Sequence, residues 1–193
     1  MLRILLLVVV CVFVHAEHEP ERVRGPVTVS PIAGMIRAQL SHNEFGAVAH
    51  LPIERIRKIV VPRDDRAEFI CASADYVQCE HYVLVGQLDA FEQLVRSMNR
   101  AQGVERELNL VSVDRDMTPY TRLELSDIAG FLVLRDRRDQ RRDVYFPADA
   151  IVSVLARDDA HTRIRHEDGE EFIIPATAQA VDAVIITVAA ASR

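Results

Sequence analysis

A short pattern occurs twice in this chain, and this repeat limits the possible folds more than any other feature. The segment LPIERI begins at Leu51 and matches FPADAI at Phe146. Upstream, SPIAG at Ser30 matches SDIAG at Ser126, at nearly the same offset. Two matched segments that keep their order and spacing are typical of repeat architectures. The sequence therefore predicts an internal duplication.

Each copy carries the pattern of strands followed by one helix. Apolar residues alternate in AEFIC and in TRIR, as in strands with one buried face. Helix-spaced apolar residues close each copy, as Phe91, Leu94, Val95 and Met98 and as Val181, Val184, Ile185 and Val188. We therefore expect an α+β fold of two tandem ββββα modules with mostly antiparallel sheet. Because a module of this size is marginal alone, the two should pack together with pseudo-two-fold symmetry.

The N-terminal segment has the plan of a secretory signal peptide. Arg3 precedes an apolar run, and Ala16 provides a small residue for cleavage. The run is shorter than the roughly 20 residues that a membrane-spanning helix needs. The predicted organisation is a signal peptide (1–16), a flexible lead-in (17–25), a first module (26–100), a linker (101–119) and a second module (120–190). The linker contains LNLVSVD, which is either part of the connection or an extra edge strand shared by the halves. A leader retained as an anchor is the alternative.

Two cysteines remain after the predicted cleavage. Cys71 and Cys79 flank the tip of a predicted hairpin. An even pair in an oxidising compartment favours a disulfide. Two separate thiols are the alternative, and a metal site with His81 ranks lower because the spacing matches no usual zinc pattern.

An arginine-rich run connects two predicted strands of the second copy. Its cations are suited to hold a phosphate or another anion, although interleaved aspartates neutralise part of their charge. A solvated hairpin tip is the competing interpretation. The candidate anion-binding residues are Arg135, Arg137, Arg138, Arg141 and Arg142. The whole chain has a formal net charge of −6, which disfavours nonspecific nucleic-acid binding.

Histidines and carboxylates near the second hairpin are candidate metal ligands. His161 and His166 lie near Asp158-Asp159 and Asp168. Their odd spacing along one strand directs the two imidazoles to opposite faces. The sequence therefore predicts no metal site and no cofactor.

Catalytic motifs are absent from the sequence: it has no HExxH, P-loop, GxGxxG or nucleophile elbow. Ser30 and Ser126 precede Ile-Ala-Gly in both copies, which indicates a backbone requirement at Gly34 and Gly130. The pairs Asp64-Asp65 and Asp158-Asp159 are typical of turns.

Residues 146–185 resemble two families of small proteins. Ile151, Val154, His161-Thr162-Arg163-Ile164, Asp168-Gly169 and Phe172-Ile173-Ile174 are similar to the run that precedes a helix in LytTR-type DNA-binding domains. The same hairpin-helix rhythm resembles the FlbD-like small flagellar-operon proteins. The first resemblance implies a β-rich DNA-binding module.

These features lead to one expected function and two alternatives. We expect a secreted or periplasmic, non-catalytic protein that binds an unknown protein or small ligand or has a structural role, without a stable membrane span after cleavage. The first alternative is a LytTR-like DNA-binding regulator with a misassigned start or a membrane tether. The second is a hydrolase with an unrecognised site near the Asp-Asp turns.

Overall fold

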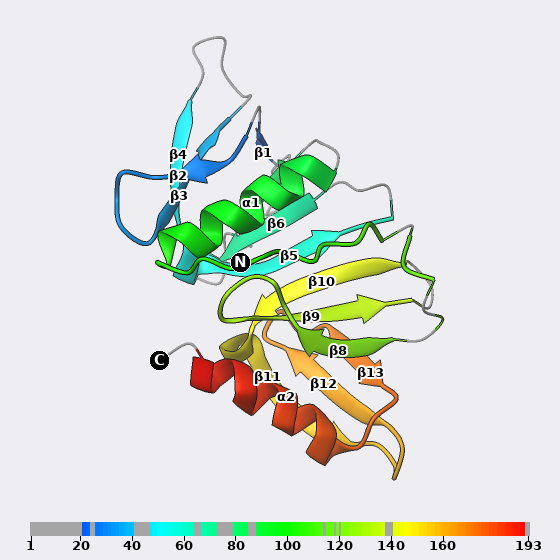
Figure 1. Ribbon diagram of the computed structural model, residues 1–193. Helices are drawn as coiled ribbons and strands as arrows, with labels where there is room; N and C mark the ends of the chain where they lie inside the picture. The colour runs from blue at the N-terminus through cyan, green and yellow to red at the C-terminus, as the bar shows by residue number, and fades with distance from the viewer. Residues whose placement is uncertain are drawn as a thin grey trace, which may run out of the picture.

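The computed structural model describes most of the chain after the leader. The described residues are 21–23, 26–40, 47–63, 67–72, 79–84, 88–113, 115–117, 119, 121–137 and 141–191. Two helices and mostly antiparallel strands confirm the predicted α+β class (Figure 1). No helix in this described part is long and apolar enough to cross a membrane.

The strands and helices follow the same order in each half. After β1 (Glu21–Val23), the first half contains β2 (Thr28–Val29), β3 (Met35–Gln39), β4 (Val48–Pro52), the 3-10 turn η1 (Ile53–Arg55), β5 (Ile56–Val61), β6 (Ala67–Ala72), β7 (Cys79–Leu84) and α1 (Leu88–Ala101). The second half contains β8 (Arg122–Leu125), β9 (Phe131–Asp136), β10 (Arg142–Pro147), η2 (Ala148–Ala150), β11 (Ile151–Ala156), β12 (Thr162–His166), β13 (Glu171–Ile174) and α2 (Ala178–Ala191).

Each helix therefore follows six strands, so the expected count of four strands is wrong. One of the two additional strands in each half arises at Pro52 and Pro147. Each proline ends a strand and begins a 3-10 turn, with φ of −63° and −67°. Because proline lacks an N–H and fixes φ near −65°, it fits this strand-to-turn corner. The residues before and after each proline thus form two separate strands.

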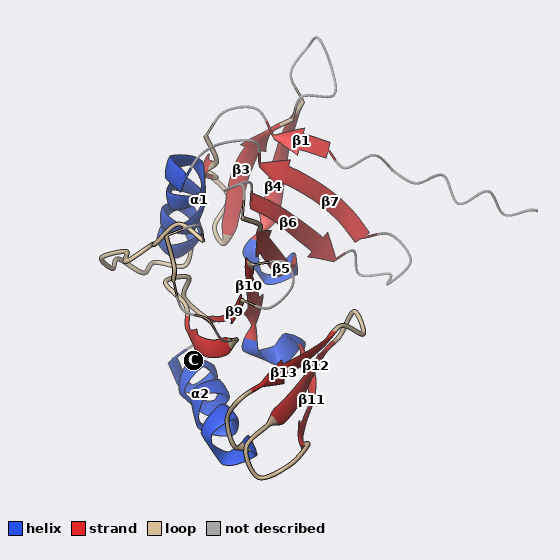
Figure 2. Ribbon diagram, turned by 90° about the vertical axis from the view of Figure 1, so that its right-hand side faces the viewer, coloured by secondary structure: helices blue, strands red, loops and turns tan. Residues whose placement is uncertain are grey.

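The strands form one large sheet and two small ones. The seven-stranded sheet has the order β1-β7-β6-β5-β10-β9-β8, and the small sheets are β2-β3-β4 and β11-β12-β13. The halves join where β5 pairs antiparallel with β10, with Val60 opposite Val144 and Ile59 opposite Tyr145. Figure 2 shows both helices on the same side of the molecule.

This junction does not have the expected pseudo-two-fold symmetry. In order of elements, β10 corresponds to β4, and β5 corresponds to β11. A two-fold axis would match the β5–β10 pair with a β4–β11 pair. Among the described strands, β4 pairs only with β3 and β11 only with β12. The halves therefore follow one another head to tail, because the junction uses a different strand from each half.

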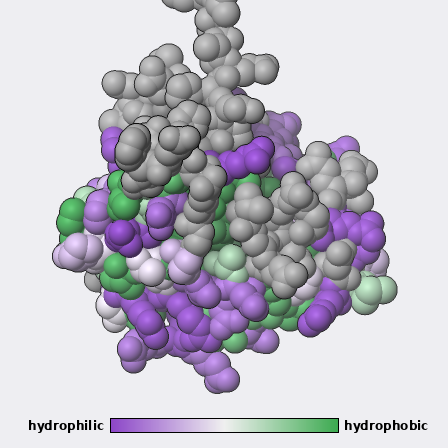
Figure 3. All heavy atoms as spheres, turned by 90° about the horizontal axis from the view of Figure 1, so that it is seen from above, coloured by the Kyte–Doolittle hydropathy of each residue, from purple (hydrophilic) through white to green (hydrophobic). Residues whose placement is uncertain are grey.

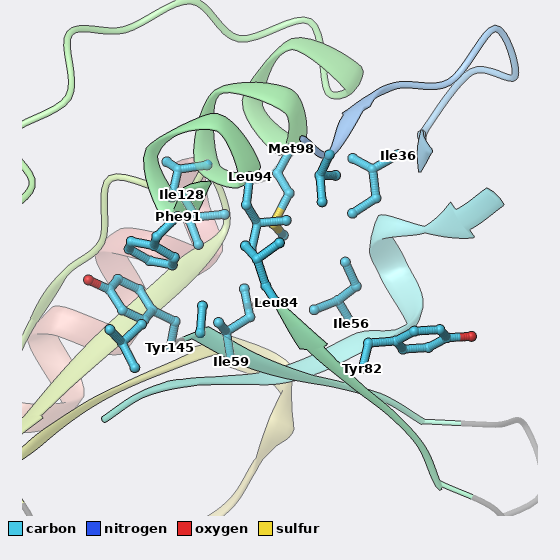
Figure 4. Close-up of a cluster of buried hydrophobic side chains, with 14 of the residues drawn as sticks. Ile36, Ile56, Ile59, Tyr82, Leu84, Phe91, Leu94, Met98, Ile128 and Tyr145 are labelled. Carbon is cyan, nitrogen blue, oxygen red and sulfur yellow. The ribbon is translucent and has the colours of Figure 1, made fainter. Parts of the chain in front are cut away.

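Two hydrophobic cores lie on opposite faces of β9 and β10. Phe131, Val133 and Tyr145 pack into the first core, whereas Leu132, Leu134, Val144 and Phe146 pack into the second. Figure 4 shows Tyr145 beside Phe91 of α1 in the first core, where the ring centroids are 5.2 Å apart. These two strands form the wall between the cores, which explains why Phe131 to Leu134 is apolar at four consecutive positions.

Both helices bury the apolar positions predicted from the sequence. Phe91, Leu94, Val95 and Met98 are buried in the first core, and Val181 and Val188 are buried in the second, with Val184 and Ile185 partly buried beside them. The hydroxyl of Thr177 accepts a hydrogen bond from the Ala180 N–H at 3.2 Å, as expected of an N-cap.

Two connecting segments differ from expectation. Residues 21–23 of the expected flexible lead-in form β1, which pairs in parallel with β7 and buries Val23. The expected linker strand does not form in its described residues, which run from Leu108 to Val113 without strand pairing. Leu108, Leu110 and Val113 still pack against the first core. These apolar residues are therefore partly or fully buried along an extended connection that is not part of a sheet.

Candidate functional site

A cleft of about 590 Å³ lies where the two halves meet. Both halves line it with corresponding segments, the Ile-Ala-Gly turns and the 3-10 turns. The lining residues are mostly apolar, with Glu54, Arg57, Gln102 and Asp149 as the polar members. A cleft of this volume with an apolar lining and few polar groups is typical of small-molecule sites.

The Ile-Ala-Gly turns have the same local structure in both halves. The hydroxyl of Ser30 accepts a hydrogen bond from the Ile32 N–H at 2.9 Å, and that of Ser126 accepts one from the Ile128 N–H at 2.9 Å. Gly34 and Gly130 close the turns with φ of +72° and +78°. Residues with a side chain rarely adopt this left-handed region, so the backbone requirement predicted at these glycines is confirmed.

The 3-10 turns bring Glu54 and Asp149 to the cleft from corresponding positions. Pro52 and Pro147 fix the start of these turns, as described above. Ile53 is buried, whereas the side chain of Asp149 is 75% exposed. The turns therefore provide both buried apolar residues and exposed carboxylates at the cleft.

Arg57 is the only cation that lines the described part of this cleft. Its Nη1 lies 3.0 Å from Asp149 Oδ1, and its Nε lies 2.8 Å from Glu167 Oε1. The hydrogen bond with Glu167 raises the pKa of Arg57, although burial acts in the opposite direction. Arg57 thus stays protonated and links the first half to two carboxylates of the second.

Gln102 is the uncharged polar group at the cleft. Its side-chain amide donates to the carbonyl oxygens of Met98 and Ala129, both at 3.3 Å. These hydrogen bonds tie the end of α1 to the second half.

Beside the cleft, the buried Lys58 is held by carboxylates that are partly exposed. Its Nζ lies 2.7 Å from Asp168 Oδ2 and also contacts Glu170, which in turn pairs with Arg142. Burial of the carboxyl group acts to raise the pKa of Asp168. Hydrogen bonds from Lys58, the Glu170 N–H and His166 outweigh burial and lower this pKa to about 2. The pKa of Glu170 is lowered in the same way by Lys58 and Arg142, against the effect of burial.

This cluster is structural in character because its charges are matched. Lys58 has two carboxylate partners, and the buried His166 lies 2.9 Å from Asp168 and contacts the Phe146 ring edge-on. A general base would need a pKa near neutrality, whereas the acidic members here have lowered pKa values. The cluster therefore fastens β5 to the β12–β13 turn.

Most arginines of the predicted anion-binding turn contact acceptor groups of the protein itself. Arg135 pairs with Glu124 and Asp143, and Arg137 pairs with Asp116 and Asp143 at 2.6 and 2.7 Å. Arg142 contacts Glu170, and Arg141 donates to the carbonyl oxygen of Asp116 at 2.8 Å. Arg138 lies outside the described residues. Four of the five candidate anion ligands are thus already bound to internal acceptors.

The buried arginine cluster also changes the acidity of Asp143. Burial raises the pKa of this carboxyl group, although Arg135 and Arg137 both act to lower it. Burial acts to lower the pKa of Arg135, but its bond with Glu124 and the charge of Asp143 raise it instead. The ion pair therefore keeps Arg135 charged within the sheet.

The predicted disulfide concerns side chains outside the described ones. Strands β6 and β7 are neighbours, with Cys71 opposite Glu80 and Cys79 opposite Ala72. The disulfide between Cys71 and Cys79 stays a prediction.

The candidate metal ligands occupy different environments. His161 is exposed and contacts Asp158 at 2.9 Å, whereas His166 is buried. Asp158 also accepts the Ala160 N–H at 2.8 Å, as in an Asx turn. Asp64 and Asp65 lie outside the described residues. No group of three potential metal ligands occurs among the residues that the structure describes.

Sequence reasoning missed Arg57 and Lys58, which form the ionic contacts at the junction. A signal was present, because two consecutive cations interrupt the apolar strand IRKIVV and Lys58 is the only lysine of the chain. Charged residues are seldom buried unless they are paired. Such a pair predicts buried partners, although it does not identify them.

Comparisons with known proteins give no relative: no family model, curated protein or solved structure matches this chain. The likeness of residues 146–185 to LytTR-type and FlbD-like proteins therefore stays a prediction.

Proposed function

We propose that this chain is a non-catalytic binding protein, built from two copies of one module, that holds a small ligand in the cleft between them. The observation that carries the proposal is the cleft of about 590 Å³ lined by corresponding segments of both halves. Secretion belongs to the same proposal and rests on the leader sequence.

The duplication is supported by the parallel order and similar lengths of the elements. Each half contains three strands, a three-residue 3-10 turn, three further strands and a 14-residue helix. The serine-to-backbone hydrogen bonds of the Ile-Ala-Gly turns have the same length in both halves. Shared ancestry explains why such details recur at corresponding positions.

The lining indicates a ligand with an apolar body and one anionic group. Pro147, Ala148 and Ala189 line the cleft, are not buried and provide apolar contacts. The Arg57–Asp149 ion pair costs little to break, because Asp149 is mostly exposed and solvent screens the pair. An incoming anion can therefore replace Asp149 beside the Arg57 guanidinium.

The test uses 8-anilinonaphthalene-1-sulfonate, an apolar dye with one anionic group. We expect saturable binding of one dye per folded chain, measured by dye fluorescence and by calorimetry. Ala189→Trp should reduce the affinity at least about tenfold, because Ala189 lines the cleft and the indole would fill it.

Ala190→Trp is the matched control. Ala190 is the next residue of the same helix, is also exposed and does not line the cleft. Its affinity for the dye should equal that of the unmodified chain. Absence of dye binding, or equal binding by both variants, would overturn the cleft as the ligand site.

A further inference from the structure

Strands β4 and β11 are two of the six edge strands of the three described sheets. Strand β4 pairs only with β3, and β11 pairs only with β12. An unpaired edge presents free backbone N–H and C=O groups, which can pair with another strand. In Figure 1, β4 and β11 lie in opposite parts of the molecule.

The internal junction shows what each of these edges can bind. Strand β5 uses its edge to pair with β10, and β11 corresponds to β5 while β4 corresponds to β10. The edge of β11 therefore corresponds to one side of an existing junction, and the edge of β4 corresponds to the other. Each molecule therefore forms this type of strand pair once, between β5 and β10, and has the two corresponding strands, β4 and β11, at sheet edges.

Burial at corresponding positions fits a missing neighbour. Asp143 and Tyr145 of β10 are buried, whereas the corresponding Val48 and His50 of β4 are exposed. Leu155 of β11 is 48% exposed, whereas the corresponding Val60 of β5 packs against the second core.

The Ile-Ala-Gly turns show the same contrast. Ile128 is 1% exposed because the first half covers it, whereas the corresponding Ile32 is 48% exposed. The surface that the first half would offer to a preceding module is thus partly apolar and open.

We infer that copies of this chain associate head to tail, with β11 of one copy antiparallel to β4 of the next. The register of the internal junction places Leu155 opposite Ala49 and Val154 opposite His50 of the neighbour. The inference rests on the proposed duplication and not on the ligand cleft. Because the two surfaces differ, the contact is heterologous and repeats into rings or open chains.

The contact between copies should be weaker and less ionic than the internal junction. Arg57, Lys58 and Asp143 of the internal junction correspond to Val152, Ser153 and Val48. Val152 is 64% exposed, so this edge has an apolar character. Apolar contacts are little affected by salt, whereas exposed ion pairs are screened. Association should therefore persist at high ionic strength.

Sedimentation velocity of the purified full chain over a range of concentrations provides the test. We expect species larger than a monomer at high concentration, in low and in high salt. Val48→Lys and Leu155→Lys should each weaken association at least about tenfold, because a lysine at a strand edge blocks pairing. A chain that stays monomeric at all concentrations would overturn the inference.

A mixture of the two variants tests the direction of the contact. The Val48→Lys chain retains β11, and the Leu155→Lys chain retains β4, so an equimolar mixture should form a one-to-one dimer that neither forms alone. If Val48→Lys alone dimerises, the contact joins identical edges and head-to-tail association is wrong.

Val29→Lys is the matched control. Val29 is 41% exposed, as Val48 is, and lies on β2, the other outer strand of the same sheet. The corresponding Leu125 is also exposed, so this position does not take part in the internal junction. Val29→Lys should associate like the unmodified chain. Dye binding by the monomeric variants separates failure of this contact from failure of the ligand cleft.

Discussion

Strands β5 and β11 hold the same place in the two halves, yet their surroundings differ. Strand β5 has neighbours on both sides, and Ile56, Lys58, Ile59 and Val61 are buried. Strand β11 has one neighbour, and none of its residues is buried. Burial of a strand in this fold therefore depends on whether another module supplies the next strand.

The largest expected effect comes from the buried ion pairs of Asp143, which lies on β10, the strand that pairs with β5. Asp143→Ala should lower the free energy of unfolding by about 3–5 kcal/mol, because Arg135 and Arg137 would lose a partner that is 1% exposed. Urea denaturation measures this change. Asp149→Ala, at an ion pair with a mostly exposed carboxylate, should cost less than about 1 kcal/mol. Similar losses in both variants would show that Asp143 is not shielded from solvent.

A second pair of substitutions compares β5 and β11 directly. Ile59→Ala should destabilise by about 2–5 kcal/mol, since Ile59 is 0% exposed and its removal leaves a cavity. Val154→Ala, at the corresponding position, should cost only about 1 kcal/mol because Val154 is half-buried. Urea denaturation at low protein concentration measures both values, so that association does not cover β11. Equal losses would contradict the difference in burial between the two strands.

The smallest effect concerns Lys58, whose counterpart on β11 is Ser153. The pKa of Asp168 is about 2 in the folded protein, below the value of about 3.9 expected in the unfolded chain. Its ion pair therefore stabilises the fold above about pH 4, and this contribution is lost as the pH falls towards 2. The loss should be on the order of 1 kcal/mol, because Asp168 is 39% exposed and solvent screens the pair.

Urea denaturation at pH 5 and at pH 2.5 measures this contribution. Lys58→Met should reduce the difference in unfolding free energy between the two pH values. Ser153→Met provides the control and should leave that difference unchanged. If Lys58→Met retains the full pH dependence, the lowered pKa of Asp168 does not depend on Lys58.

Much of the local structure could be predicted from the sequence. The apolar positions of both helices and the left-handed glycines at 34 and 130 lie where local patterns placed them. These features depend on residues close in the chain, so their signals are contained in short segments.

The candidate site was less accessible to sequence reasoning. The Ile-Ala-Gly turns that line the cleft were recognised, but the 3-10 turns were not. Arg57 and Lys58 were not connected with Glu167 and Asp168, which lie far along the chain. The arginine turn was identified as a cluster of cations, although the carboxylates that occupy Arg137 come from Asp116 and Asp143. A charge pattern in the sequence indicates which side chains need an ionic partner, but it does not identify the residues that provide it.

Local sequence patterns predicted that strands precede one helix in each half, although they did not separate the strands on either side of Pro52 and Pro147. Alternating apolar residues, turn glycines and helix-spaced side chains specify these elements locally. Only the tertiary structure decided that β5 pairs with β10 and that β4 and β11 keep unpaired edges. The reason is physical: backbone hydrogen bonds can join any two strand edges, so packing between distant segments selects the pair.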